Sequence, residues 1–224
     1  MDRRAAIADA AIAVIARDGV RALTHRALDR ELDLPAGSSS YYLRTRRDLL
    51  AATVDRLAER TVADLLEPAE GRVGFADGGM PIADPVDRVS GMMAALLVRS
   101  MQARGDDHRA RFALAAELVG DPELHAMVTS RSPIRSRLIA GAVEMLTALG
   151  AADPGGRAPA LVALADGILH DRLVGSRAGL TESDTDRLAD VQRTLADYLR
   201  GAARGTGSNI SEAENLFHHV DDRR

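Results

Sequence analysis

Four of the eight prolines directly follow an aspartate or a serine, and these pairs constrain the fold more than any other feature of the chain. An Asp or Ser side chain accepts hydrogen bonds from the free amides of a helix's first turn. Proline at the next position has a helical φ and lacks only an amide that would be unpaired anyway. The pairs predict helix starts at Asp84-Pro85, Asp121-Pro122, Ser132-Pro133 and Asp153-Pro154, and capping boxes predict two more at Thr45-x-x-Asp48 and Thr181-x-x-Asp184.

Apolar residues after these starts recur every three or four positions, which is the spacing of one face of a helix. This spacing extends over residues 86–103, 134–149, 160–174 and 182–203, and no segment alternates with period two for long enough to predict a strand. We therefore predict an all-α protein of about nine helices. Two stretches rich in Gly or polar residues are expected to be a long loop, at 67–84, and a disordered tail, at 204–224.

The composition argues against several classes of enzyme. The chain has no Cys, and all 29 of its basic residues are Arg, so it lacks a thiolate nucleophile, a P-loop lysine and a Schiff-base lysine. It also lacks a Cys-based or His-rich zinc motif. We expect no enzymatic activity, no metal and no cofactor. We find no transmembrane segment and no signal peptide, which predicts a cytoplasmic protein.

The first 47 residues contain the pattern that indicates a function. Residues 3–18 predict an amphipathic helix that ends at Gly19, and Thr24 is the expected N-cap of a second helix. A turn at 32–34 leads to a short third helix at about 35–43. Two short helices joined by a tight turn, behind a packing helix, are typical of a helix-turn-helix DNA-binding unit.

The third predicted helix is better suited to contact DNA than to pack. Its sequence at 36–42, Ala-Gly-Ser-Ser-Ser-Tyr-Tyr, has low helix propensity, but small hydroxyl residues let a helix approach base edges and donate to phosphates. The net charge of −4 also conceals an asymmetry. Residues 1–47 hold nine Arg and six acidic residues, a net charge of +3, whereas the remainder holds 20 Arg and 27 acidic residues, a net charge of −7.

Residues 5–56 contain four strings in a specific order. They are Ile7-Ala-Asp-Ala-Ala11, Gly19-Val-Arg-Ala-Leu23-Thr24, Gly37-Ser-Ser-Ser-Tyr41-Tyr42-Leu43 and Thr45-Arg46-Arg47-Asp48-Leu49-Leu50. In this order and spacing the chain resembles the DNA-binding domain of the tetracycline-repressor (TetR) family of bacterial transcriptional regulators. It departs from that pattern at Asp33, Leu43 and Arg46, where the family usually has Gly, Phe and Lys.

The resemblance implies that the third helix enters the major groove and that the second helix crosses the DNA backbone. It implies DNA contacts at Thr24, His25, Arg26, Ala36, Ser38, Ser39, Tyr41, Tyr42 and Arg46. We expect Arg26 to contact guanine, and Thr24, Tyr42 and Arg46 to bind phosphates. Tyr41 could instead pack into the core, and Arg44 and Arg47 are expected to be solvated charges.

The resemblance divides the chain into a helix-turn-helix domain, 1–47, and a helical effector-binding and dimerisation domain, 48–203, entered through a connecting helix at 45–66. The candidate effector-pocket residues are Met93, Leu96, Leu97, Phe112, Met127, Leu146 and His170, although each could simply fill the core. The candidate dimer-interface residues are Leu161, Ile168, Leu188, Val191, Leu195 and Tyr198, which could otherwise complete a monomer core.

Together these features predict a TetR-like repressor that binds a palindromic DNA operator as a homodimer and is released by a small-molecule effector. Such a protein is cytoplasmic and associates with the nucleoid when bound to DNA. One alternative is an all-helical ligand-binding protein or adaptor without DNA binding, and another is a helical enzyme. Neither alternative needs a basic N-terminal unit with the Ser-Ser-Ser-Tyr-Tyr string.

Overall fold

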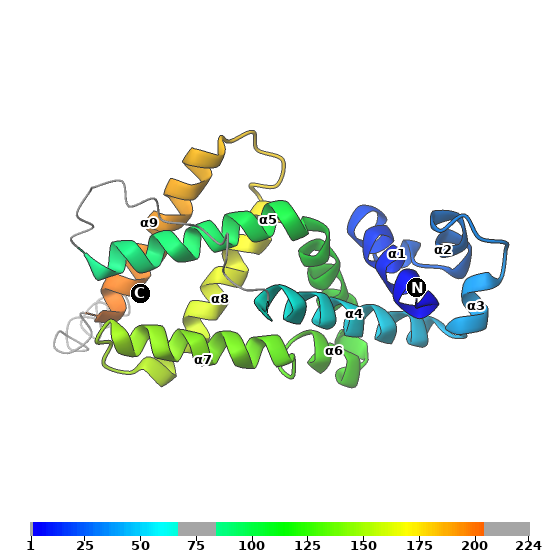
Figure 1. Cartoon of the computed structure of the whole chain (residues 1–224), viewed down its shortest axis with the longest axis horizontal. Helices are drawn as coiled ribbons and strands as arrows, with labels where there is room; N and C mark the ends of the chain where they lie inside the picture. The colour runs from blue at the N-terminus through cyan, green and yellow to red at the C-terminus, as the bar shows by residue number, and fades with distance from the viewer. Residues whose placement is uncertain (1, 67–83, 204–224) are drawn as a thin grey trace, which may run out of the picture.

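The computed structural model describes residues 2–66 and 84–203. These ranges form nine α-helices and two short 3₁₀ turns, with no β-strand, which confirms the predicted all-α fold (Figure 1). The helices are α1 (Arg3–Asp18), α2 (His25–Glu31), α3 (Ser38–Tyr42), α4 (Arg46–Leu66), α5 (Pro85–Glu117), α6 (Pro122–Val128), α7 (Pro133–Ala148), α8 (Pro154–Leu173) and α9 (Asp184–Ala203). The 3₁₀ turns are Val20–Ala22 and Leu118–Gly120. The predicted tail at 204–224, and the predicted loop at 67–84 apart from Asp84, lie outside the described residues.

The Pro-marked helix starts are confirmed. Asp84, Asp121 and Asp153 each accept a hydrogen bond from an amide in the first turn of α5, α6 and α8. α7 also begins at its proline, although Ser132 makes no side-chain capping bond. Local sequence is therefore enough to predict where these four helices begin.

One capping box is confirmed and the other is wrong. The Thr45 amide donates to Asp48 Oδ2 at 2.9 Å and the Asp48 amide donates to Thr45 Oγ1 at 3.0 Å, at the start of α4. At α9 the cap lies two residues later than predicted, because the Asp186 amide donates to Ser183 Oγ at 3.1 Å. Thr181 therefore precedes the helix and does not cap it.

The first three helices gather at one end of the molecule, which we call the head, and α5 to α9 form the body (Figure 1). α4 runs from one to the other. The head core extends beyond the head, because Ala110 and Leu114 in the second half of α5 are fully buried with Ile7 of α1 and Leu28 of α2. The predicted domain boundary at residue 47 falls inside this shared core.

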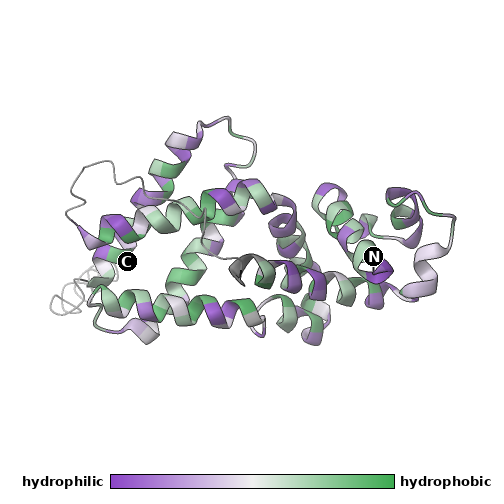
Figure 2. Ribbon diagram, in the orientation of Figure 1, coloured by the Kyte–Doolittle hydropathy of each residue, from purple (hydrophilic) through white to green (hydrophobic). Residues whose placement is uncertain are grey.

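The body core lies between α5, α7, α8 and α9. Its buried members are Val86, Ala94, Val98, Ala142, Leu146, Ala158, Leu161, Val162, Val191, Leu195, Ala196, Leu199 and Ala202. Figure 2 shows hydrophobic and hydrophilic residues alternating around these helices, and no helix in the described ranges is both long and apolar enough to span a membrane.

The predicted dimer seam is mostly internal to one chain. Leu161, Val191 and Leu195 are each at most 1% exposed, and they pack in the body core. Those three residues cannot offer a surface to a partner, and their assignment to the dimer interface is wrong. The periodic apolar face of α9 packs on α5 of the same chain, which is the monomer-core alternative. Ile168, Leu188 and Tyr198 are only partly buried, and the Tyr198 hydroxyl donates to the Arg157 carbonyl at 2.8 Å.

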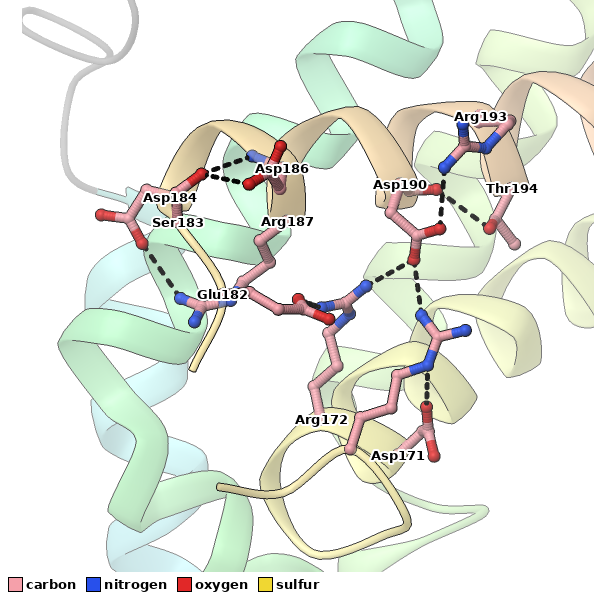
Figure 3. Close-up of polar contacts among 11 residues, drawn as sticks. Asp171, Arg172, Glu182, Ser183, Asp184, Asp186, Arg187, Asp190, Arg193 and Thr194 are labelled. Carbon is pink, nitrogen blue, oxygen red and sulfur yellow. Dashed lines mark hydrogen bonds and ion pairs between the residues drawn. The ribbon is translucent and has the colours of Figure 1, made fainter. Parts of the chain in front are cut away.

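An arginine-carboxylate network fixes the connection between α8 and α9 (Figure 3). The Arg172 side chain, near the end of α8, is only 5% exposed and pairs with Glu182 in the connection and with Asp190 in α9. Arg177 adds a second bond to Asp190, with Nη1 at 2.6 Å from Oδ2. The network links α8, the connection and α9, so the angle between the two helices is set by buried charge as well as by apolar packing.

A half-buried histidine lies in the second half of α5. His108 Nε2 shares a hydrogen bond of 2.7 Å with Ser100 Oγ. Burial, reinforced by the positive charges of Arg111 and Arg104, lowers the pKa of His108 to about 4. The imidazole is therefore neutral at pH 7, whereas in the unfolded chain its pKa is near 6.5.

We predict that the stability of the protein falls as the pH is lowered from about 6.5 to 4. Over that range the unfolded chain binds a proton at His108 that the folded chain does not, so the free energy of unfolding decreases by up to about 3 kcal/mol. Chemical denaturation at a series of pH values measures this. The variant His108→Gln should have a flatter profile, whereas His170→Gln, at an exposed site, should keep the slope because His108 is still present. An equally steep profile in His108→Gln would refute the assignment.

Candidate nucleic-acid interface

The helix-turn-helix unit is built around the cap of α2. Thr24 Oγ1 accepts a hydrogen bond from the Ala27 amide at 3.1 Å, which confirms its predicted capping role. This bond uses an oxygen lone pair, so the hydroxyl proton stays available for an acceptor outside the protein. Thr24 is exposed at the start of the helix, where such an acceptor can reach it.

The turn after α2 needs backbone conformations that few residues adopt. Asp33 has φ +51°, the only positive φ of a non-glycine residue in the described ranges, and Gly37 has φ +90°. Asp tolerates the left-handed region and glycine enters it without a steric penalty. α3 begins only after Gly37, at Ser38, so the third helix is shorter than predicted and Ala36 lies in the turn.

Asp29 holds the start of α3, although it is not among the residues predicted for this interface. Its carboxylate, 3% exposed, accepts from the Gly37 amide at 2.7 Å and from the Ser39 amide at 2.8 Å. Burial alone would raise the pKa of Asp29, but the hydrogen bonds from Ser39 and Gly37 and the nearby charge of His25 hold it below its ordinary value. The carboxylate thus replaces the side-chain cap that Gly37 lacks. The sequence signal was an acid on α2 directly after the buried Leu28.

Ser39 and His25 support the turn from inside. Ser39 is fully buried and its hydroxyl donates to the His25 carbonyl at 3.2 Å. The predicted DNA contact at Ser39 is therefore wrong, because the residue has no exposed surface. His25 Nε2 donates to the Leu43 carbonyl at 2.6 Å and fixes the end of α3 to the start of α2.

The outer face of α3 carries two exposed tyrosines. Tyr41 is 78% exposed and Tyr42 is 40% exposed, and their rings meet edge to face with centroids 5.2 Å apart. The alternative that Tyr41 packs into the core is excluded by this exposure. The Ser38 hydroxyl donates to the Pro35 carbonyl at 2.6 Å, which leaves its oxygen lone pairs free.

The three arginines around the start of α4 have different partners. Arg46 donates to the Leu23 carbonyl at 2.7 Å and to the Val20 carbonyl at 2.9 Å, so its guanidinium braces the head. Arg47 pairs with Asp121 and Glu123 in the α6 region, at 2.9 and 2.6 Å. Arg44 is exposed and, among the residues that the structure describes, has no acidic partner. Arg44 is therefore the one of these three arginines without a carboxylate partner or a bonded carbonyl in the described ranges, whereas the predicted phosphate contact Arg46 is engaged with the head.

The predicted effector-pocket residues are not brought together as one lining. Leu146 is fully buried in the body core, Met127 packs against the head core, and Leu96 is 42% exposed. Phe112 and His170 do meet, with ring centroids 5.1 Å apart. Leu97 and Met93 lie against the body core, and Leu97 also packs with Phe112 on a small cluster of Met101, Leu169 and Leu173. Within 2–66 and 84–203, no group of three His, Asp or Glu residues could hold a metal ion.

Comparison with known proteins places the chain in a family. Residues 84–205, more than half of the chain, match the family model described as the tetracyclin repressor-like C-terminal domain. The chain belongs to the TetR family of transcriptional regulators. This match covers the body, whereas the resemblance in the sequence covers the head, so the two ends indicate the same family independently.

Solved structures of TetR-family and related regulators share the fold. A transcriptional regulator from Rhodococcus sp. Rha1 is 20% identical, with a TM-score of 0.65 over 91% of this chain and 97% of its own. A TetR-family member from Streptomyces coelicolor A3 is 26% identical, with a TM-score of 0.53 over 87% and 98%. The multidrug binding protein EbrR complexed with ethidium is 25% identical, with a TM-score of 0.53 over 86% and 98%. No curated protein matches the chain.

We predict that Asp29→Asn loosens α3 without unfolding the rest of the head. An Asn side chain cannot accept from both amides with a full charge, so the free energy of unfolding should fall by about 1–3 kcal/mol. The amides of Gly37 and Ser39 should exchange hydrogen faster. In the parent chain the same bonds should weaken only as the pH falls through the lowered pKa of Asp29, below its ordinary 3.8.

The matched control is Asp33→Asn, because Asn also tolerates a positive φ and Asp33 is exposed. In this variant the amides of Gly37 and Ser39 should exchange hydrogen at the same rate as in the parent chain. If Ser39 exchanged at the parent rate in Asp29→Asn, the carboxylate would not be the cap of α3.

Proposed function

We propose that this TetR-family regulator binds double-stranded DNA through the exposed face of α3 and the residues that flank it. The observation that carries the proposal is the pair of exposed tyrosines, Tyr41 and Tyr42, on a short helix whose inner face is fully engaged. A helix that only packed would bury its aromatic residues, since each ring can bury a large apolar area. An exposed pair on a rigid turn is suited to contact a groove wall.

The flanking groups have donors that fit phosphate and base edges. Arg26 is exposed on the first turn of α2, and within the described ranges no carboxylate pairs with it. We assign Arg26 to a guanine and Thr24, Tyr42 and Arg44 to phosphates, with Ser38 and Tyr41 at the base edges. Ala36 and His25 border this face, but we assign neither of them a hydrogen bond to DNA. Ala36 has no side-chain donor, and His25 Nε2 already donates to the Leu43 carbonyl.

We propose further that the protein is a cytoplasmic repressor that leaves a palindromic operator when an effector binds in the body. The effector is a small molecule, and we place its site at α5 and α8, where Leu97, Phe112 and His170 come together. EbrR, which is complexed with ethidium, supports an aromatic ligand as a first class to examine. Effector and DNA would then weaken each other's binding by the same factor.

We also propose a homodimer, because helix-turn-helix regulators read two half-sites with two-fold symmetry. The supporting surface is the outer side of α8 and α9. Ala163 and Gly167 are exposed on α8, and they line a hollow between α8 and α9 together with Ile168, Thr194 and four charged residues, Asp171, Arg172, Arg177 and Asp190. Small residues let two helices approach closely.

Arg44 and Arg26 should affect DNA binding in different ways. The variant Arg44→Ala should bind every DNA sequence more weakly, and the slope of log K against log salt should become shallower by about one phosphate contact. The variant Arg26→Ala should instead lose discrimination at one base step, at a cost of about 1–3 kcal/mol. Both are measured by titration with DNA that the full-length protein selects from a random library, over a range of salt concentrations.

The matched control is Arg47→Ala, which removes an arginine from the same region that is already paired with α6. It should keep the parent salt slope. If the full-length protein selected no DNA, or if Arg44→Ala kept the parent slope, the proposed interface would be wrong.

Gly167 on α8 allows a test of the proposed dimer. A Cβ atom at Gly167 would meet no atom within 4 Å, so Gly167→Arg should fold as a monomer and place a charge on the proposed interface. Sedimentation velocity should show a dimer for the parent chain and a monomer for the variant. Gly141→Arg is the control, since Gly141 in α7 is exposed and has equal space. A dimeric Gly167→Arg would move the interface elsewhere.

A further inference from the structure

The two hydrophobic cores share one long helix. The first half of α5 supplies Val86, Ala94 and Val98 to the body core, and its second half supplies Ala110 and Leu114 to the head core. α5 is therefore rigidly attached at both ends to different groups of helices. Any change of angle between head and body must bend α5 or separate one half of it from its core.

α5 is bent between the two halves. Arg104 has φ −137° and ψ 29°, which are not helical values, although helix continues on both sides. The bend has no proline, but Gly105 directly follows Arg104 and its low helix propensity permits a bend there. The side chain of Arg104 is only 11% exposed and turns toward α4. Its Nη1 donates to the Arg60 carbonyl at 3.1 Å and its Nη2 donates to Thr61 Oγ1 at 3.1 Å.

A buried carboxylate lies at the centre of this bend. The side chain of Asp107 is 6% exposed, and its Oδ2 accepts from Arg104 Nε at 2.9 Å and also from Arg104 Nη2. Its Oδ1 lies 3.2 Å from Arg60 Nη2. One carboxylate thus pairs with an arginine of α5 on one oxygen and with an arginine of α4 on the other.

The charge network continues from α4 into the head. Arg60 Nη1 lies 3.6 Å from Asp9 Oδ1 in α1. Asp9 also receives two bonds from Arg56, at 2.7 and 3.0 Å, in a bidentate pair. The chain of alternating charges therefore runs from α1 through α4 to the bend of α5, the point at which the head core gives way to the body core.

We propose that Asp107 is a positioning residue that sets the angle between head and body. Its carboxylate fixes the bend of α5 to α4 and so keeps both halves of α5 in their cores at one angle. The proposal rests on the proposed function in one respect: in a dimer this angle decides whether two α3 helices reach successive major grooves, about 34 Å apart. The angle itself can be measured without DNA.

We expect the buried ion pairs of Asp107 to define the angle of the bend in α5 more than to increase the free energy of unfolding. A buried ion pair contributes little net free energy, because desolvation offsets the attraction, but loss of one partner leaves an uncompensated buried charge. Without the Asp107 carboxylate, the bonds that it accepts from Arg104 of α5 and its ion pair with Arg60 of α4 are lost. This loss releases the bend from α4 while the apolar contacts of the two cores remain.

Pulsed electron spin resonance on the full-length chain tests this. Because the chain has no native Cys, Arg21→Cys in the head and Arg137→Cys in the body, both at exposed positions, give two specific spin labels. The doubly labelled chain is diluted in an excess of unlabelled chain, so that each distance is measured within one copy. Asp107→Asn is compared with Asp106→Asn, which removes the neighbouring acid, whose side chain is 68% exposed.

We expect a narrow distance distribution in the parent chain and in Asp106→Asn, and a shifted or broadened one in Asp107→Asn. Thr61→Val, which removes one contact of Arg104 without unpairing the carboxylate, should broaden the distribution to a smaller extent. It also keeps the test valid if Asp107→Asn fails to fold. The parent distribution in folded Asp107→Asn, or in Thr61→Val where Asp107→Asn is unfolded, would overturn the proposal.

A DNA titration separates this proposal from the proposed function. With library-selected DNA, Asp107→Asn should lose affinity at least about fivefold relative to Asp106→Asn. If the parent chain bound no DNA while the distance shift was present, the proposed function would fail and the positioning role would stand. A distance shift with unchanged DNA affinity would overturn the link between this angle and DNA binding.

Discussion

The burial of one helix in two cores is the constraint on which the arrangement of the other helices depends. α5 packs with α1 at one end and with α8 and α9 at the other, so head and body are not independent units joined by a linker. Its apolar residues alone would permit a range of bends, because apolar contact has little directionality. The Arg104–Asp107 pair supplies the directional contact, and it does so at the boundary of the two cores.

The sequence predicts features that depend on residues next to each other in the chain. It does not predict features that depend on contacts with residues far away in the chain. Helix starts at Asp84 and Asp153 follow from a side chain and a proline next to each other, and both are confirmed. The apolar seam of α9 is equally regular, but periodicity shows only that a face is covered and not by which chain. Leu195 packs inside its own chain because of contacts with residues far away in the sequence, which a local pattern does not show.

Charge counts from the sequence also fail to identify which arginines are free at the candidate interface. Arg44, Arg46 and Arg47 are nearly consecutive, and the sequence ranks Arg46 first. In the fold Arg46 turns to two backbone carbonyls of the head and Arg47 to two acids of the body. Which cation is free depends on acceptors that are 23 or more residues away, so composition can indicate a basic unit without identifying its contact residues.

α3 has a low intrinsic helix propensity, but contacts with neighbouring residues hold it in a helix. Ser and Tyr give it low helix propensity, and its five residues are too few to hold a helix in isolation. Its stability comes from outside, through the Asp29 carboxylate at its start, the buried Ser39 hydroxyl and the His25 ring at its end. Because those inner contacts hold the backbone, the outer positions need not contribute to folding. Tyr41 and Tyr42 can therefore remain exposed on a rigid support, which is the condition that contact with a DNA groove requires.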